Sequence, residues 1–126
     1  MNDRELLVAA AKAAGYAVIG WDNALPDTPI VTGDRFGCGA TVKWVWMPLA
    51  DDGDALRLAV SLGISITPYP IYRSDARHAV VAKQRRSGDT LRELNPTETL
   101  EPYGDNPCAA TRRAIVRAAA ATVAKP

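Results

Sequence analysis

The sequence predicts an α/β chain of the α+β class, an α-β-α sandwich in which about three helices cover a mostly antiparallel sheet. Three observations predict this class. Segments with helical periodicity lie near the start, in the middle and at the end of the chain. Runs rich in β-branched and aromatic residues lie between them. Several of these runs are joined by hairpin-like connections, as antiparallel neighbours are, so the helices must cover the faces of the sheet.

The first helix and the first strand are marked by their end signals. Residues 3–14 carry one apolar stripe of leucines and alanines. Asn2 can act as the N-cap, with Glu5 three residues later as in a capping box. Gly15 suits the left-handed residue that ends a helix. Residues 16–21, YAVIGW, are rich in β-forming side chains and predict a strand.

A stretch rich in proline and glycine follows. Residues 22–39 predict a long loop that holds a short strand at 30–32, and loops of this length are often functional. TVKWVW at 41–46 alternates like a strand, with Trp44 and Trp46 on one face. We expect this face to pack in the core. The alternative is that an exposed tryptophan beside an arginine forms a stacking platform.

Three aspartates follow that strand in the stretch PLADDGDALRLAV. A metal or acid/base site is one interpretation, but the order D-D-G-D lacks the alternate spacing and the downstream glutamate of a calcium loop. The other interpretation is a helix start, in which Asp51 or Asp52 caps the first turn, Gly53 permits the bend and Asp54 complements the helix dipole. We favour the helix start, which predicts a helix over 54–62.

The second half of the chain predicts more strands and a last helix. Gly63 ends the middle helix, and Asn106 and Pro107 mark the start of an alanine-rich helix at 107–123. The other predicted elements are strands at 64–66, 78–84 and 90–94, a hairpin turn at 85–89 and a proline-punctuated connector at 95–107.

Composition limits the classes of function. The 126 residues suit one compact domain, residues 1–126. Lys and Arg total 15 and Asp and Glu total 14, so the net charge is +1 and no overall field attracts nucleic acid or an anionic membrane. The start of the chain does not read as a signal peptide, and no run reaches the roughly 18 apolar residues of a membrane span, which predicts a cytoplasmic protein. Cys38 and Cys108 have no metal-ligand spacing, and we expect both to be reduced.

Three segments together resemble a known family. They are DRELLVAAAKAAG near the start, PLADDGDALRLAVSLGI in the middle and NPCAATRRAIVRAAA near the end. In this order they resemble the small bacteriophage and prophage proteins that carry the phage ABA (α-β-α) sandwich domain. The resemblance implies a layered fold for the single domain and a phage origin. It implies no reaction, and no catalytic residue can be carried over from it.

A small anionic ligand is the predicted binding partner. The ligand-binding candidates are Arg112, Arg113, Arg57 and Trp46. Arg112 and Arg113 lie near the start of the last helix, where backbone N–H groups favour anions and arginines add fork-shaped donors. Because cations are slightly unfavourable at a helix N-terminus, both arginines need a partner. That partner is either an anionic ligand or an acidic side chain, such as Asp105 or one of the aspartates at 51–54.

We predict no catalytic residues, no metal and no cofactor. His78 has no nucleophile motif beside it, and a triad cannot be recognised from sequence alone. Cys108 is either activated by the helix start or packed in the interior, and we favour packing. Three tyrosines in proline-containing segments either line a pocket rim or pack ordinarily in loops: Tyr69, Tyr72 and Tyr103.

The sequence therefore predicts a non-enzymatic phage or prophage accessory protein of the host cytoplasm. It would bind or sequester a small anionic ligand such as a host signalling nucleotide. Because one small domain rarely encloses a nucleotide, we expect a homo-oligomer with the site at a subunit interface. The alternative is a protein–protein interaction module that modulates a host or phage partner through an exposed patch. Nucleic acid is not favoured, because KQRR at 83–86 is too small a basic segment.

Overall fold

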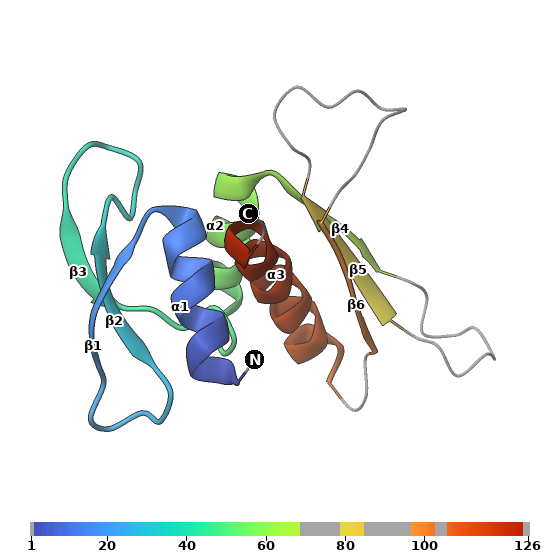
Figure 1. Ribbon diagram of the computed structural model, residues 1–126, viewed down its shortest axis with the longest axis horizontal. Coiled ribbons are helices and arrows are strands. Elements are labelled where there is room, and N and C mark those ends of the chain that lie inside the picture. The colour runs from blue at the N-terminus through green and yellow to red at the C-terminus, as the bar shows by residue number, and fades with distance from the viewer. Residues whose placement is uncertain (1, 69–78, 85–96, 103–105, 125–126) are drawn as a thin grey trace.

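The computed structural model describes residues 2–68, 79–84, 97–102 and 106–124 (Figure 1). The predicted turn at 85–89 and strand at 90–94 lie outside these residues. So do the side chains of His78 and the three tyrosines named above, and their interpretations stay predictions.

Nine helices and strands follow one another in the described parts of the chain. In order they are α1 (Asp3–Ala14), β1 (Ala17–Trp21), β2 (Pro29–Gly33), β3 (Val42–Val45), α2 (Asp52–Leu62), β4 (Ile64–Pro68), β5 (Ala79–Gln84), β6 (Thr97–Pro102) and α3 (Pro107–Ala124).

The predicted α+β class, with antiparallel strands and three helices, is confirmed. The described strands form two antiparallel sheets, β1-β2-β3 and β4-β5-β6, and the helices lie between them (Figure 1). The helix α1 contacts the N-terminal sheet, α3 contacts all three strands of the C-terminal sheet, and α2 packs against both helices and β4. The layers therefore run sheet, helices, sheet, whereas the sequence predicted one sheet covered by helices. The strand β4 pairs with β5 and not with β3, so it belongs to a second sheet.

The helix ends follow the sequence signals closely. The side chains of Asn2, Asp51 and Asn106 each accept a hydrogen bond from the backbone N–H three residues later, at 2.8, 2.8 and 3.0 Å. Gly15 and Gly63 end α1 and α2 in the left-handed conformation, with φ of 81° and 65°. These caps are local devices, which explains why the helices could be predicted from short stretches.

Two stretches predicted as irregular contain strands. The short strand expected at 30–32 is present and longer, as β2, and it is the central strand of its sheet. The predicted connector at 95–107 is wrong in part, because β6 occupies Thr97–Pro102. The prolines of this stretch disfavour a strand in the middle of a sheet. Proline is tolerated here because β6 is an edge strand and Pro102 is its last residue.

Alanines bring the central helices close together. Ala10 and Ala11 of α1 and Ala114 and Ala118 of α3 have no exposed surface, and the two helices contact each other along their length (Figure 1). Small side chains let the helix axes approach closely. The alanine-rich α3 is therefore an interior helix, packed between α1, α2 and the C-terminal sheet.

Gly33 is required by an aromatic ring. A Cβ added at Gly33 would lie 2.8 Å from Cδ1 of Tyr16, a distance that forces the ring to shift. We expect Gly33→Ala to lower the free energy of unfolding by about 1–2 kcal/mol, because the Tyr16 ring is packed against the core. Urea unfolding followed by tryptophan fluorescence measures this change.

Gly20 provides the matched control for that substitution. It also lies in a strand, β1, but a Cβ added there meets no atom within 4 Å. Gly20→Ala should change stability by less than about 0.5 kcal/mol. Equal losses of stability at the two positions would contradict this explanation. They would show that the loss comes from the backbone preference of glycine and not from a clash with Tyr16.

Candidate functional site

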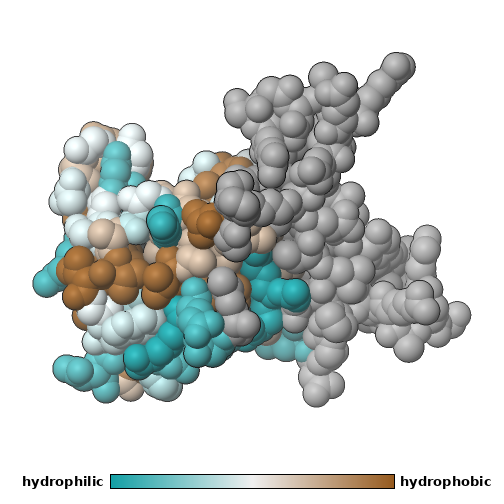
Figure 2. Space-filling view, in the orientation of Figure 1, coloured by the Kyte–Doolittle hydropathy of each residue, from teal (hydrophilic) through white to brown (hydrophobic). Residues whose placement is uncertain are grey.

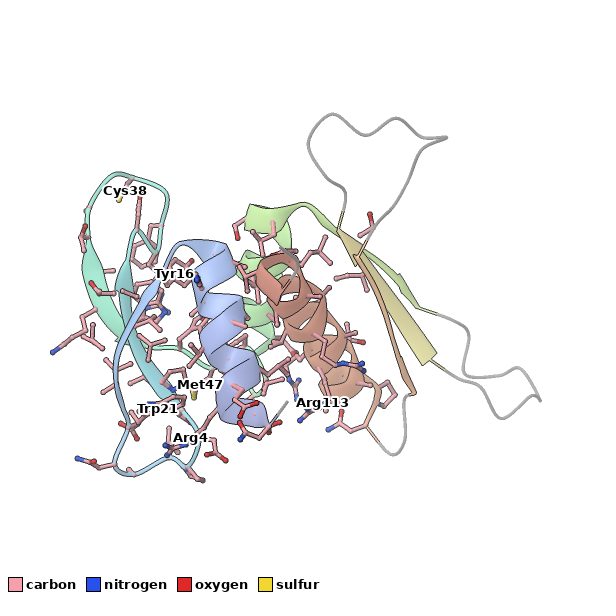
Figure 3. The ribbon with its side chains drawn as sticks, viewed as in Figure 1. Arg4, Tyr16, Trp21, Cys38, Met47 and Arg113 are labelled. Carbon is pink, nitrogen blue, oxygen red and sulfur yellow. The ribbon has the colours of Figure 1, made fainter. Side chains whose placement is uncertain are left out.

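The four candidate residues do not form one site. Arg113 faces the start of α1, where its Nη1 and Nη2 atoms lie 3.1 and 3.4 Å from the two carboxylate oxygens of Asp3 (Figure 3). This fork-shaped pair ties the first turn of α1 to α3. Of the two partners that the sequence left open for Arg113, the structure shows an acidic side chain.

Arg112 points in another direction, toward α2. Its Nη1 donates to Oδ1 of Asp52 at 2.6 Å, and its Nε donates to the carbonyl oxygen of Leu49 at 3.0 Å. The Arg112 side chain is largely buried, whereas 75% of the Asp52 side chain is exposed. The guanidinium is thus fixed from the protein side, and a ligand carboxylate or phosphate could replace Asp52 without moving it.

An open pocket of about 310 Å³ lies beside this pair, between α2, β4 and α3. Its lining residues are Asp52, Ala55, Leu56, Ile66, Cys108, Thr111, Arg112 and Ile115. Most of the wall is therefore apolar, with a charged pair, a hydroxyl and a thiol among it. The Thr111 hydroxyl donates to the Pro107 carbonyl oxygen at 2.8 Å, which leaves its oxygen free to accept from a ligand.

Two helices begin at this pocket. Asp52 stands at the start of α2 and Cys108 in the first turn of α3. The backbone N–H groups at helix starts create partial positive charge, and Arg112 adds a full charge. The Asp52 carboxylate opposes this field from the solvent side. The pocket suits a small molecule with an apolar body and an anionic group that competes with Asp52.

Arg57 and Trp46 belong to a different cluster, around Asp54. The Asp54 carboxylate, only 5% exposed, accepts from Arg57 Nη2 at 2.7 Å and from the Met47 backbone N–H at 2.9 Å. Trp46 precedes Met47 and is buried, with its ring edge-on to that of Tyr16 at 5.7 Å. Trp46 therefore belongs to the core, as predicted for its strand face, and offers no stacking surface.

Arg35 and Tyr16 complete this second cluster. Arg35 Nη2 lies 4.0 Å from Oδ1 of Asp54, and its guanidinium carbon is 5.4 Å from the ring centroid of Trp44. Burial raises the pKa of the Tyr16 hydroxyl, while Arg57 lowers it and Asp54 raises it further. The hydroxyl therefore stays protonated near neutral pH and remains a hydrogen-bond donor.

The three aspartates have separate structural tasks. Asp51 caps α2, Asp52 pairs with Arg112, and Asp54 joins the end of the β3 segment to α2 through Met47. The helix-start interpretation is confirmed, and α2 begins two residues earlier than predicted. Within the described ranges, no three His, Cys, Asp or Glu side chains are placed to hold a metal ion.

Both cysteines are free thiols, as predicted, and both are exposed. The prediction that Cys108 is packed in the interior is wrong, because its side chain is exposed and lines the open pocket. Cys38 lies in the loop between β2 and β3, on the far side of α1 from α3 (Figure 3).

Sequence reasoning missed Arg35 and Tyr16 as members of a polar cluster. Neither residue belongs to a motif, and the sequence predicts Tyr16 only as the first residue of a strand. The one available signal was the loop at 22–39, whose length suggested function and which contains Arg35. What joins these residues is Asp54, which lies far along the chain from Tyr16.

No protein family model, no curated protein and no solved structure matches this chain. The resemblance to the phage ABA sandwich proteins therefore remains a prediction. None of the helices described is long and apolar enough to cross a membrane.

Proposed function

We propose that this protein is a non-enzymatic accessory protein of a phage or prophage that binds a small anionic ligand in the cytoplasm of the host. The observation that carries the proposal is the pocket at the starts of α2 and α3, with the fixed guanidinium of Arg112 in its wall. A host signalling nucleotide would suit this pocket. The flat faces of its base are largely apolar, like most of the pocket wall, and its phosphate is anionic and could pair with Arg112.

The size of the pocket bears on how the ligand is held. Ligand sites usually measure about 300–1,000 Å³, so a pocket of about 310 Å³ lies at the lower end of that range, and its open side would leave part of a bound nucleotide exposed. A second copy of the chain over the open side would complete the enclosure. The proposal therefore includes a homo-oligomer, and bound ligand should favour it.

Arg112 and Arg113 are neighbours that provide a matched pair of variants. We expect Arg112→Gln to weaken ligand binding at least about tenfold, because a charge-assisted hydrogen bond to a buried anion contributes about 1.5–3 kcal/mol. Arg113→Gln removes the same charge from the same helix but outside the pocket, so affinity should stay within about twofold. Calorimetry with a panel of cyclic mononucleotides and dinucleotides measures both.

The result that contradicts the proposal is equally specific. Absence of binding by every nucleotide up to about 1 mM would sink it. Equal affinity in the Arg112→Gln variant and the parent protein would remove Arg112 from the site. Each variant is first checked for unchanged secondary structure by circular dichroism, because Arg112 also holds the Leu49 carbonyl oxygen.

Exposed apolar residues favour a second candidate function, the protein–protein interaction module. Leu56 and Val60 lie one turn apart on α2 and are exposed by 59% and 73%. Figure 2 shows a separate apolar band over β1 and α1, where Val8 and Ile19 are exposed. Contiguous apolar surface of this kind often marks an interaction site. A silent nucleotide panel would shift the assignment to this function.

A further inference from the structure

A second group of hydrogen-bond donors lies around the loop at 34–41, between β2 and β3. Arg35 carries five N–H donors, yet it makes no hydrogen bond with any residue that the structure describes, and its nearest ion-pair oxygen is 4.0 Å away on Asp54. The Nε atom of Arg35 is enclosed without a partner, and so is the indole Nε1 of Trp44. Buried donors are nearly always paired in proteins. This cluster therefore has more donors than acceptors.

The nearby carboxylates accept no hydrogen bond from Arg35. One oxygen of Asp54 accepts from Arg57, and the other accepts from the Met47 backbone N–H. The carboxylate oxygens of Asp34 accept from two backbone N–H groups of its own loop, at 3.0 and 2.8 Å. Both carboxylates are thus occupied by donors other than Arg35.

The accessible side of the cluster has the groups of an oxyanion site. The Nη2 atoms of Arg35 and Arg57 both lie within 4.0 Å of the same Asp54 oxygen, and both side chains are partly exposed. The protonated hydroxyl of Tyr16 lies within electrostatic range of both arginines. The ring of Phe36 is 68% exposed and its centroid is 5.3 Å from the guanidinium carbon of Arg35. A flat apolar face therefore stands beside two cations.

We propose that Arg35 and Arg57 bind a phosphate carried on a planar ring, as in a mononucleotide, with the ring stacked on Phe36. The phosphate supplies the acceptors that the cluster lacks, and planar guanidinium groups match phosphate oxygens. Aromatic side chains stack on any nucleobase, since every base has a π-face.

This site is distinct from the pocket at Arg112 and does not depend on it. Asp52 and Asp54 are two residues apart on α2, so their side chains point to opposite sides of the helix. Asp52 lies on the side of α2 that faces the pocket and Arg112. Asp54 lies on the side that faces Arg35 and Arg57. The two sites can therefore be tested separately in one protein.

Three probes test the chemistry: adenosine monophosphate, adenosine and inorganic phosphate, each titrated while tryptophan fluorescence and heat are recorded. We expect the monophosphate to bind at least tenfold more tightly than either part alone. Arg35→Gln should weaken its binding at least tenfold. Phe36→Leu should weaken binding of the monophosphate and leave inorganic phosphate unchanged.

Arg4→Gln is the matched control. Arg4 also lies over an aromatic ring, 4.5 Å from the centroid of Trp21, but its Nε is paired with Asp27 at 2.9 Å. Binding of the monophosphate should be unchanged in this variant. Arg35→Lys keeps the charge and removes the fork, so a folded Arg35→Lys protein with weakened binding supports the proposal even if Arg35→Gln is unstable.

Two outcomes would overturn the proposal. The first is the absence of any monophosphate binding, or binding that Arg35→Gln and Arg35→Lys leave unchanged. The second is loss of monophosphate binding in Arg112→Gln together with its retention in Arg35→Gln, which would place the ligand in the pocket. Because the variants act on different sides of α2, failure here and failure of the pocket proposal give different patterns.

Discussion

Asp54→Ala is expected to lower the free energy of unfolding by about 3 kcal/mol, one of the two largest effects predicted for this chain. The carboxylate is almost fully buried and accepts two hydrogen bonds, one from the Met47 backbone N–H and one from Arg57. Removal of one partner of a buried ionic network typically destabilises a protein by about 3–5 kcal/mol. Because the Arg57 side chain is partly exposed and can turn to water, we expect a value near the lower end.

Two further variants separate the parts of that effect. Asp54→Asn keeps an oxygen for the Met47 N–H but loses the charge and replaces the oxygen that accepts from Arg57 with an NH2 group, so we expect a loss of about 1–2 kcal/mol. Asp52→Ala removes a mostly exposed aspartate of the same helix turn, and Arg112 keeps its hydrogen bond to the Leu49 carbonyl oxygen, so we expect a loss of about 1 kcal/mol or less. Urea unfolding of the three proteins gives the comparison. Equal losses for Asp52→Ala and Asp54→Ala would refute a special role for burial.

The secondary structure could largely be predicted because its signals are local. Asn2, Asp51 and Asn106 each bond an N–H three residues later, and Gly15 and Gly63 each end a helix by their own conformation. Both partners of each capping hydrogen bond lie within four consecutive residues, so each cap can be predicted from a short stretch of sequence. The same holds for Trp44 and Trp46, whose alternation with Lys43 and Val45 predicted that both lie on the core-facing side of the strand, where both are buried.

The division into two sheets could not be predicted in this way. Strand pairing joins residues that are far apart in the sequence, and the apolar patterns of β3 and β4 suit one sheet as well as two. The decisive fact is that α2 lies between them and packs against α3. Since β6 is bordered by prolines, its pairing with β5 was also hidden.

The sequence predicted which residues would take part in polar contacts, but it did not predict which of them lie together. Arg112 and Arg113 are adjacent in sequence, but consecutive helix residues point about 100° apart, so one meets Asp52 and the other meets Asp3. Their partners lie 60 and 110 residues away. Arg57 is joined to Arg35 and Tyr16 only through the fold. Contacts between side chains so far apart in the chain cannot be predicted from the spacing of residues in the sequence.

The close contact of the central helices leads to the second large expected effect. Ala118→Leu should lower the free energy of unfolding by about 3 kcal/mol. Ala118 has no exposed surface and lies in the middle of α3, which is enclosed by α1, α2 and the C-terminal sheet. The larger side chain has no solvent side into which it can turn, so α3 must move away from a neighbour. Urea unfolding and the thermal midpoint both report this change.

Ala121→Leu distinguishes overpacking from any change in helix propensity. Ala121 lies on the same helix but is partly exposed, and leucine forms helices almost as readily as alanine. We expect a change below about 0.5 kcal/mol at this position. If Ala118→Leu were as mild, α3 would have room along its buried face, and alanine would be present there for some reason other than close packing. If only Ala118→Leu is severe, the alanines of α3 set the spacing between the two sheets, and with it the positions of Arg112 and Arg113.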